Sequence, residues 1–274
     1  MKPLILLRGL FRGQHHWGDF PKKLSEKLVD YDVRCLDIPG TGELFHQDSP
    51  SSISAIVDAL RAQVSNEQPL SLLSLSMGGM IALNWAERYP DDVKQIIAIN
   101  TSSQSLSPFY HRLRPANYSR LCHALLSTPV QRETLVYQAV SNQPLNNRII
   151  HRWVHLNECC KLRKINLFRQ LKAAFNFKAM KPLCPLTLIA SEQDNLVNVE
   201  CSKVLSHHWD CPLLIHPTAG HDLPLDDPEW LCEQIETSLN INAKTHVADN
   251  PRRTDSARVT DNVLVTEKSK GSQK

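Results

Sequence analysis

Six short apolar runs, separated by segments of helical periodicity, constrain the fold of this chain more than any other feature. Most of the runs lack the polar alternation of a half-exposed strand, so we expect strands that are buried on both faces. Strands of this kind that alternate with helices predict a parallel sheet with right-handed crossovers. The runs span residues 3–7, 33–38, 70–75, 95–100, 186–190 and 213–216, and the predicted helices between them span 19–29, 54–64, 79–88 and 199–207.

A long segment without a strand-like run, residues 104–180, interrupts this alternation. Its periodicity predicts helices near 119–126, 129–141, 146–160 and 164–176. Because ligands bind at the carboxyl ends of parallel strands, we expect this insertion to form a lid over a site there. The core then consists of residues 1–103 and 181–240. Residues 241–274 are polar and almost without apolar periodicity, which predicts a disordered tail.

The net charge of +3 hides a strong asymmetry along the chain. The insertion carries twelve Lys and Arg against only Glu133 and Glu158, a net charge of +10, whereas the core carries −10 and the tail +3. A basic lid suits an anionic substrate or an acidic partner. Solvated helix faces explain arginines such as Arg148 and Arg152 equally well.

Composition argues against several other classes of protein. The eight cysteines show no CxxC pair and the twelve histidines no HExxH pair, so we expect free thiols, no metal and no cofactor. The first apolar run is too short for a signal peptide, and no run approaches the roughly 18 residues of a membrane span. These features predict a cytoplasmic protein without stable membrane insertion. Nucleic-acid binding is disfavoured, because Trp153 and Phe168 fall at helical spacing and are expected to pack inward.

The segment Ser74-Leu75-Ser76-Met77-Gly78-Gly79 lies between an apolar run and a helical segment. A serine on such a strained strand-to-helix turn presents its hydroxyl above the sheet, and the turn needs small residues two positions to either side. Gly78 and Ser74 meet this demand. Ser76 is therefore a candidate nucleophile, and the Met77 N–H, at the positive end of the helix, a candidate oxyanion donor. Taken alone, Ser76 could also be a helix N-cap.

A base and an acid are predicted from the loops after the last two runs. His221 follows the final run, and Asp194 follows the run before it. An acid that accepts a hydrogen bond from one imidazole nitrogen leaves the other free to take the serine proton. His216 is a rival base, and Glu192 and Asp222 are weaker candidates for the acid.

The loop after the first run reads Arg8-Gly9-Leu10-Phe11-Arg12-Gly13 and is followed by Trp17. Gly9 gives the backbone the freedom to turn its amides inward, so the Leu10 N–H is the second candidate oxyanion donor. Trp17 and Trp153 are candidates for contact with a substrate.

Together these motifs resemble the α/β-hydrolase superfamily over residues 1 to about 240. The order Ser76, Asp194, His221 is that of the family, and residues 37–42, 87–93 and 227–229 look like its loop motifs. The resemblance implies about six parallel strands, because the chain begins at the third strand of the family. Ser74 and Arg8 depart from its usual residues.

The resemblance also implies an activity. It suggests a serine esterase that cleaves a carboxylic ester through an acyl-enzyme, with thioester or C–C bond hydrolysis and a non-catalytic binding protein as alternatives. Small lidded carboxylesterases of biotin synthesis are similar, which implies a small acyl ester, carried by acyl carrier protein or CoA when the substrate is anionic.

Overall fold

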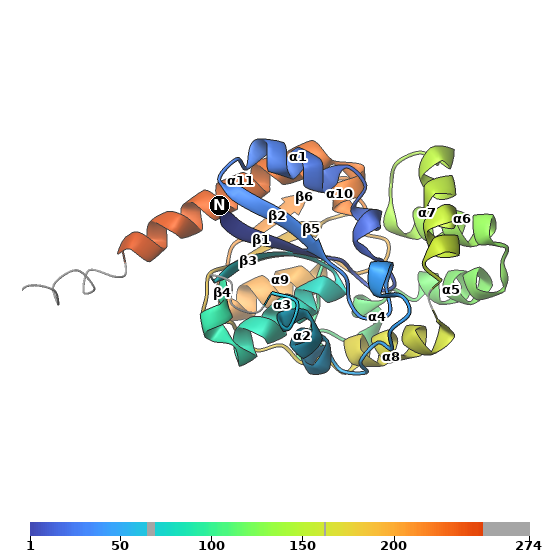
Figure 1. Cartoon of the computed structure of the whole chain (residues 1–274), viewed down its shortest axis with the longest axis horizontal. Coiled ribbons are helices and arrows are strands. Elements are labelled where there is room, and N and C mark those ends of the chain that lie inside the picture. The colour runs from blue at the N-terminus through green and yellow to red at the C-terminus, as the bar shows by residue number, and fades with distance from the viewer. Residues whose placement is uncertain (65–68, 162, 249–274) are drawn as a thin grey trace, which may run out of the picture.

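A six-stranded sheet forms the centre of the molecule (Figure 1). The computed structural model describes residues 1–64, 69–161 and 163–248. Every neighbouring pair of strands is parallel, in the order β2-β1-β3-β4-β5-β6. This confirms the sheet expected from the sequence. The strands are β1 (Lys2–Leu7), β2 (Tyr31–Leu36), β3 (Leu70–Leu75), β4 (Val93–Ile99), β5 (Leu186–Ser191) and β6 (Leu213–His216).

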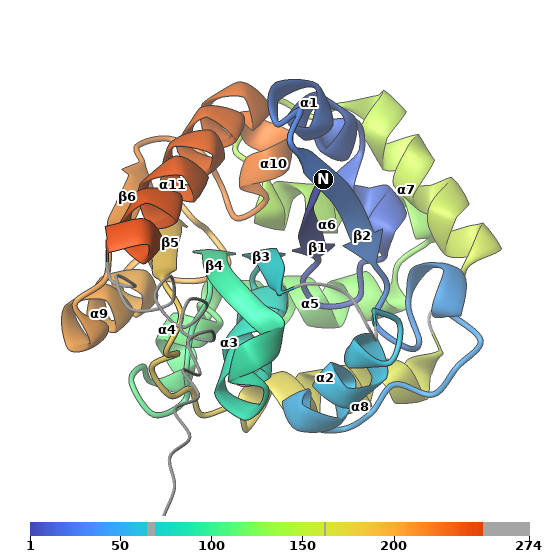
Figure 2. The same cartoon turned by 60° about the vertical axis from the view of Figure 1, so that its left-hand side comes forward.

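Helices cover both faces of the sheet (Figure 2). Alternate residues of one strand face opposite sides, so Ile5 and Leu7 pack with one set of helices and Leu4 and Leu6 with the other. Both faces are therefore largely apolar, which is why most of the strands appear in the sequence as apolar runs without polar alternation. One layer contains α2 (Ile53–Arg61), α3 (Met77–Arg88) and α9 (Glu200–Trp209), and the other contains α1 (Phe20–Lys27) and α11 (Pro228–Ala248).

The chain between β4 and β5 forms helices that lie to the right of the sheet in Figure 1. Trp153 is buried there with Tyr137 and Ile150 in a small separate cluster. Phe168, in contrast, is 65% exposed, so the expectation that it packs inward is wrong. These helices are α4 (Phe109–Arg112), α5 (Ala116–Leu126), α6 (Pro129–Val140), α7 (Asn147–Cys159) and α8 (Lys164–Phe175).

The last helix is longer than the sequence suggests. Leu239 is a buried core residue of α11, and the helix continues to Ala248. The prediction of disorder is therefore wrong for residues 241–248, because extending an existing helix costs far less than starting one. Residues 249–274 of the predicted tail lie outside the described residues. No helix in the described part of the chain is long and apolar enough to cross a bilayer.

A carboxylate at the end of β2 organises the neighbouring loops. Asp37 accepts hydrogen bonds from the N–H groups of Gln14 (2.6 Å) and Glu43 (2.9 Å), and burial raises its pKa. Gly42 has a positive φ of 51°, and a Cβ added there would lie 2.1 Å from Asp37 Oδ2. The motif at residues 37–42 is therefore a carboxylate enclosed by backbone.

The tight enclosure of Asp37 predicts that substitution by alanine destabilises the protein by different amounts at two glycines of positive φ. Gly18 has φ 62° and ψ −131°, with open space around its missing Cβ, so Gly18→Ala should cost only the backbone strain, about 1–3 kcal/mol. Gly42→Ala must also displace the buried Asp37 and should cost roughly 2 kcal/mol more than Gly18→Ala. Urea unfolding measures both values, and equal losses would contradict the tight enclosure of Asp37.

Candidate active site

Ser76 lies on the sharp turn between β3 and α3. Its backbone has φ 58° and ψ −117°, a strained conformation for a residue other than glycine. The turn is held from β4, because the Ser76 N–H donates to Ile99 O (2.8 Å) and the Thr101 hydroxyl donates to Ser76 O (2.9 Å). The Ser76 side chain is thus presented at the carboxyl edge of the sheet, and the residue is only partly buried.

The small residues around Ser76 have steric reasons. A Cβ on Gly78 would lie 2.3 Å from Leu7 O, and one on Gly9 would lie 3.1 Å from the Ser76 Cβ. The turn therefore packs directly against the end of β1. Ser74 is accommodated within the sheet because its hydroxyl donates to Ile97 O (3.2 Å).

Asp194 and His221 form a buried pair, in which the His221 Nδ1–H donates to Asp194 Oδ2 at 2.7 Å. The other carboxylate oxygen of Asp194 accepts from the N–H groups of Leu196 (2.7 Å) and Val197 (2.9 Å). Three donors thus fix the carboxylate, which in turn fixes the ring. Within the described residues neither the Ser76 hydroxyl nor His221 Nε2 has a hydrogen-bond partner. In hydrolases without substrate, the hydrogen bond between the serine hydroxyl and the histidine is often long, and it tightens only when substrate binds.

Asn100, which the sequence analysis missed, connects these loops. Its backbone has a positive φ of 49°, and its side-chain amide donates to His221 O (2.9 Å) and to the Ser191 hydroxyl (3.2 Å). Its Oδ1 accepts from the Ser191 N–H (2.8 Å). The next residue, Thr101, binds the Ser76 carbonyl. An Asn directly after a strand was the available signal, because Asn tolerates positive φ better than most residues.

The rival acid and base have other partners. Glu192 is exposed and pairs with Lys203. His216 binds Asp227 through Nε2 (3.1 Å), and its Nδ1 accepts from backbone N–H groups. The remaining rival, Asp222, forms an ion pair with Arg8.

The Arg8–Asp222 pair joins the loop after β1 to the loop that carries His221. The guanidinium donates to both carboxylate oxygens, at 3.0 and 2.7 Å, and both residues are buried. Arg8 also lies 4.7 Å above the Trp17 ring. Trp17, predicted to contact a substrate, is 3% exposed and packs against Phe20. Its surroundings are those of a core residue.

The insertion is hydrogen-bonded to the loops of the candidate site. Arg114 Nη1 donates to Asp194 O (2.7 Å), and the Asn142 side chain donates to Gln193 O (3.0 Å) and Thr218 O (2.9 Å). Part of the basic charge of the insertion is therefore structural. Trp153, the other predicted substrate contact, is buried beneath the Arg12 guanidinium, which lies 4.5 Å from its ring.

The two predicted oxyanion donors lie on either side of the Gly9–Ser76 contact. In the described part of the chain neither the Leu10 N–H nor the Met77 N–H has an acceptor. The neighbouring Phe11 N–H donates to Gln170 Oε1 (3.1 Å), and Phe11 has a φ of 63°. A side chain of α8 thus fixes the loop one residue beyond Leu10.

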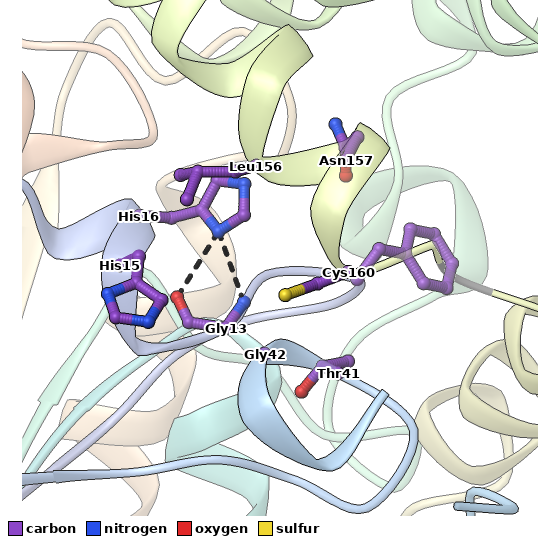
Figure 3. A pocket seen from close by; sticks show the side chains of 9 residues that line it. Gly13, His15, His16, Thr41, Gly42, Leu156, Asn157 and Cys160 are labelled. Carbon is purple, nitrogen blue, oxygen red and sulfur yellow. Dashed lines mark hydrogen bonds between the residues drawn. The ribbon is translucent and has the colours of Figure 1, made fainter. Parts of the chain in front are cut away.

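A small cavity lies beside this loop (Figure 3). It has a volume of about 10 Å³, room for about one water molecule, and His16 lines it, with Nδ1 bonded to the Gly13 backbone. A larger surface groove of about 720 Å³ lies beside residues 143–149. Among the described residues, the lining of neither space includes Ser76, Asp194 or His221.

The Arg8–Asp222 pair predicts a specific pattern of stability. Asp222→Asn leaves a buried guanidinium without its counter-charge and should destabilise by about 3–5 kcal/mol. The double variant Arg8→Met/Asp222→Leu should lose less than Asp222→Asn alone, because it removes both charges. Glu192→Gln, in an exposed pair, is the matched control and should change little. Denaturant unfolding tests the series, and a double variant less stable than the single one would contradict the argument.

His16 predicts a pH dependence of folding. Burial, and then the charges of Arg12 and Arg8, lower its pKa well below 6.5. As the pH falls, His16 is therefore protonated in the unfolded chain before it is protonated in the folded protein. The contribution of neutral His16 to the free energy of unfolding is thus complete above pH 6.5 and is lost as the pH falls below that value. The free energy of unfolding should fall less between pH 8 and pH 5 in His16→Gln than in the wild type. The exposed His208→Gln serves as control, and an unchanged slope in His16→Gln would show that His16 is not the group responsible.

Comparisons with known proteins agree with this architecture. Residues 2–116 match the family described as the alpha/beta hydrolase fold. A pimeloyl-[acyl-carrier protein] methyl ester esterase of Neisseria meningitidis is 33% identical over 97 residues, which span 35% of this chain and 35% of that esterase. The human monoacylglycerol lipase ABHD6 is 23% identical over 276 residues, 93% of this chain and 79% of the lipase. The chain thus matches about a third of the length of the Neisseria esterase.

A solved structure supports the same fold. The crystal structure of a candidate lipase from Acinetobacter baumannii superposes with a TM-score of 0.72 and 22% identity, over 89% of this chain and 85% of that one. The six parallel strands, the strained serine turn and these matches agree. The chain is therefore a protein of the α/β-hydrolase fold that resembles the pimeloyl-[acyl-carrier protein] methyl ester esterases.

Proposed function

We propose that this chain is a serine esterase that cleaves a carboxylic ester through an acyl-enzyme on Ser76. The observation that carries the proposal is the buried Asp194–His221 pair (2.7 Å), held at the edge of the sheet where the strained turn presents Ser76. The related esterase and lipase support ester hydrolysis as the reaction.

In the proposed mechanism His221 acts first as a base and then as an acid. Its Nε2 takes the hydroxyl proton as Ser76 Oγ attacks the ester carbonyl, and then returns that proton to the leaving alcohol. Asp194 fixes the Nδ1–H tautomer and stabilises the imidazolium. Water activated by His221 then attacks the acyl-enzyme, which releases the acid and restores Ser76.

The tetrahedral intermediates need donors for their oxyanion. The N–H groups of Met77 and Leu10 are proposed for this role, since each lacks another acceptor among the described residues. A donor of this kind contributes roughly 3–4 kcal/mol to catalysis. The bond from Phe11 N–H to Gln170 keeps the loop in place before the charge develops.

The insertion is proposed as a lid over a small acyl group, which an anionic carrier such as acyl carrier protein or CoA would present. The similar Neisseria esterase acts on a carrier-linked methyl ester by its name. On α7 exposed basic charge for this role is offered by Arg148 and by Arg152, whose guanidinium lies 3.9 Å from Asp19. Arg114 is already used to hold the Asp194 loop, and Arg163 and Arg169 pair with Asp48.

Substitutions of the proposed triad test the mechanism. Ser76→Ala and His221→Ala should each lower kcat for a p-nitrophenyl ester by about 10⁶-fold, because the two residues act as one unit. Asp194→Asn should cost roughly 10⁴-fold. Glu192→Gln is the matched control for the acid and should retain full activity, since among the described residues its carboxylate pairs with Lys203 and with no group of the proposed site.

The wild type should also be labelled by a fluorophosphonate at Ser76, and Ser76→Ala should not. An unlabelled wild type would identify a non-catalytic binding protein of the same fold. Loss of activity in Glu192→Gln with a silent Asp194→Asn would instead show that the acid is misassigned. Esters of increasing acyl length, with a carrier-linked methyl ester beside them, then define the substrate.

A further inference from the structure

The outward face of α8 carries apolar side chains that the core does not use. Phe168 is 65% and Phe175 56% exposed, and Ile165 and Leu171 are exposed beside them. Their spacing of three or four residues places them on one side of the helix. Asn166, Gln170, Ala173 and Ala174 on the opposite side are buried and join α8 to the rest of the protein.

Exposed aromatic side chains also occur on α4, which is bonded to the end of α8. Arg112 donates from its two Nη atoms to Phe175 O (2.8 Å) and Ala174 O (2.5 Å), which fixes α4 against the end of α8. Phe109 and Tyr110 of α4 are also exposed. We call these six side chains the α8 face: Phe109, Tyr110, Ile165, Phe168, Leu171 and Phe175. Figures 1 and 2 both show α8 at the margin of the molecule, next to α2.

The segment that contains α8 is strongly basic. The sequence between Cys159 and Ser191 contains seven Lys and Arg and no Asp or Glu. Arg163 and Arg169 both pair with the single carboxylate of Asp48, which offsets one of their two charges. The other five form no ion pair with any described acidic residue, and all are exposed: Lys161, Lys164, Lys172, Lys178 and Lys181.

We propose that the α8 face docks on the surface of a lipid bilayer that contains anionic phospholipids. Exposed aromatic and aliphatic side chains flanked by lysines are typical of protein surfaces that lie in a membrane interface. The apolar side chains enter the boundary between headgroups and acyl chains, while the lysine stems extend along it and their ammonium groups meet the phosphates. The docking is peripheral, and the helices remain on one side of the bilayer.

A lipid surface fits the α8 face better than a folded partner does. The side chains project from a convex helix, and no described residue of this face lines either the cavity or the groove of the structure. A folded partner would have to supply a groove of matching shape for these projecting side chains. A fluid bilayer needs no such complementarity, because its acyl chains rearrange around projecting side chains.

The inner side of α8 connects this face to the candidate site. Gln170 holds the Phe11 N–H, one residue beyond the proposed oxyanion donor Leu10. A docked α8 therefore places that loop about one helix diameter, roughly 10 Å, from the lipid. Esters dissolved in the membrane are then close to the site, a consequence that rests on the proposed function, whereas the docking itself does not.

Vesicle flotation with the full chain tests the docking. The probes are vesicles of phosphatidylcholine alone and of an equimolar mixture of phosphatidylcholine and phosphatidylglycerol. The wild type should bind the mixed vesicles, and added salt should weaken this binding because the lysine contribution is screened. Phe168→Ser/Phe175→Ser should weaken it by roughly tenfold or more through lost apolar burial. Lys164→Glu/Lys172→Glu should remove the preference for anionic lipid, since each basic charge near such a surface contributes about a fivefold factor.

Matched controls lie on the opposite part of the molecule. Val29→Ser removes an equally exposed apolar side chain, and Lys22→Glu reverses an exposed lysine on α1. Both should float like the wild type. All variants should keep their circular dichroism and react with a fluorophosphonate at the wild-type rate in the absence of lipid. A wild type that floats without such labelling would support docking while the proposed function fails.

Three results would overturn the docking. These are a wild type that does not float with mixed vesicles, equal flotation of the α8-face variants and the controls, and equal binding to both kinds of vesicle. Binding of the wild type to an acidic carrier protein instead, abolished by the same lysine and phenylalanine substitutions, would identify the face as a protein interface and the lipid proposal as wrong.

Discussion

The side-chain amide of Asn100 is the interaction on which the rest of the candidate site depends. From the end of β4 it bonds the His221 carbonyl and both the N–H and the hydroxyl of Ser191, while the adjacent Thr101 bonds the Ser76 carbonyl. The loops that carry Ser76, Asp194 and His221 come from segments far apart in sequence. One buried dipeptide with a strained backbone thus fixes their relative positions, and the strain is tolerated because every polar group of the Asn100 side chain is satisfied.

The insertion supplies further hydrogen bonds to the loops that Asn100 holds. Asn142 bridges the Asp194 loop and the His221 loop from the side of the helices, and Asp226 accepts from the N–H groups of both Asn142 and Gly220. The Arg8–Asp222 pair ties the loop after β1 to the same region. The Asp194 and His221 loops are therefore held both from the end of β4 and from the insertion, whereas the Ser76 turn is held from β4 and the end of β1. The insertion serves as part of the scaffold, so its polar residues cannot all be assigned to contact with a substrate.

The sheet could be predicted because burial on both faces leaves a direct trace in the sequence, as in Leu4 to Leu7 and Leu70 to Leu75. The sequence also selected Asp194 and His221, which the structure brings within hydrogen-bonding distance. An Asn directly after a strand signals a positive φ, but Asn100 was missed because the sequence does not show which distant groups its side chain bonds. The Arg8–Asp222 pair joins residues 214 positions apart, and a contact of that range leaves no local pattern.

The error over Phe168 has a different physical origin. Helical periodicity identifies an apolar stripe but cannot say which side of the helix faces the protein. On α8 the buried side is largely polar or small, because Asn166 and Gln170 bond the backbone of the loops after β1 and β2. Those amides satisfy groups that apolar residues could not, and they leave the apolar stripe outside. A helix whose polar face is buried and whose apolar face is exposed gains nothing from that exposed face in the isolated chain. Folding alone therefore does not explain why the side chains on the outer face of α8 are apolar.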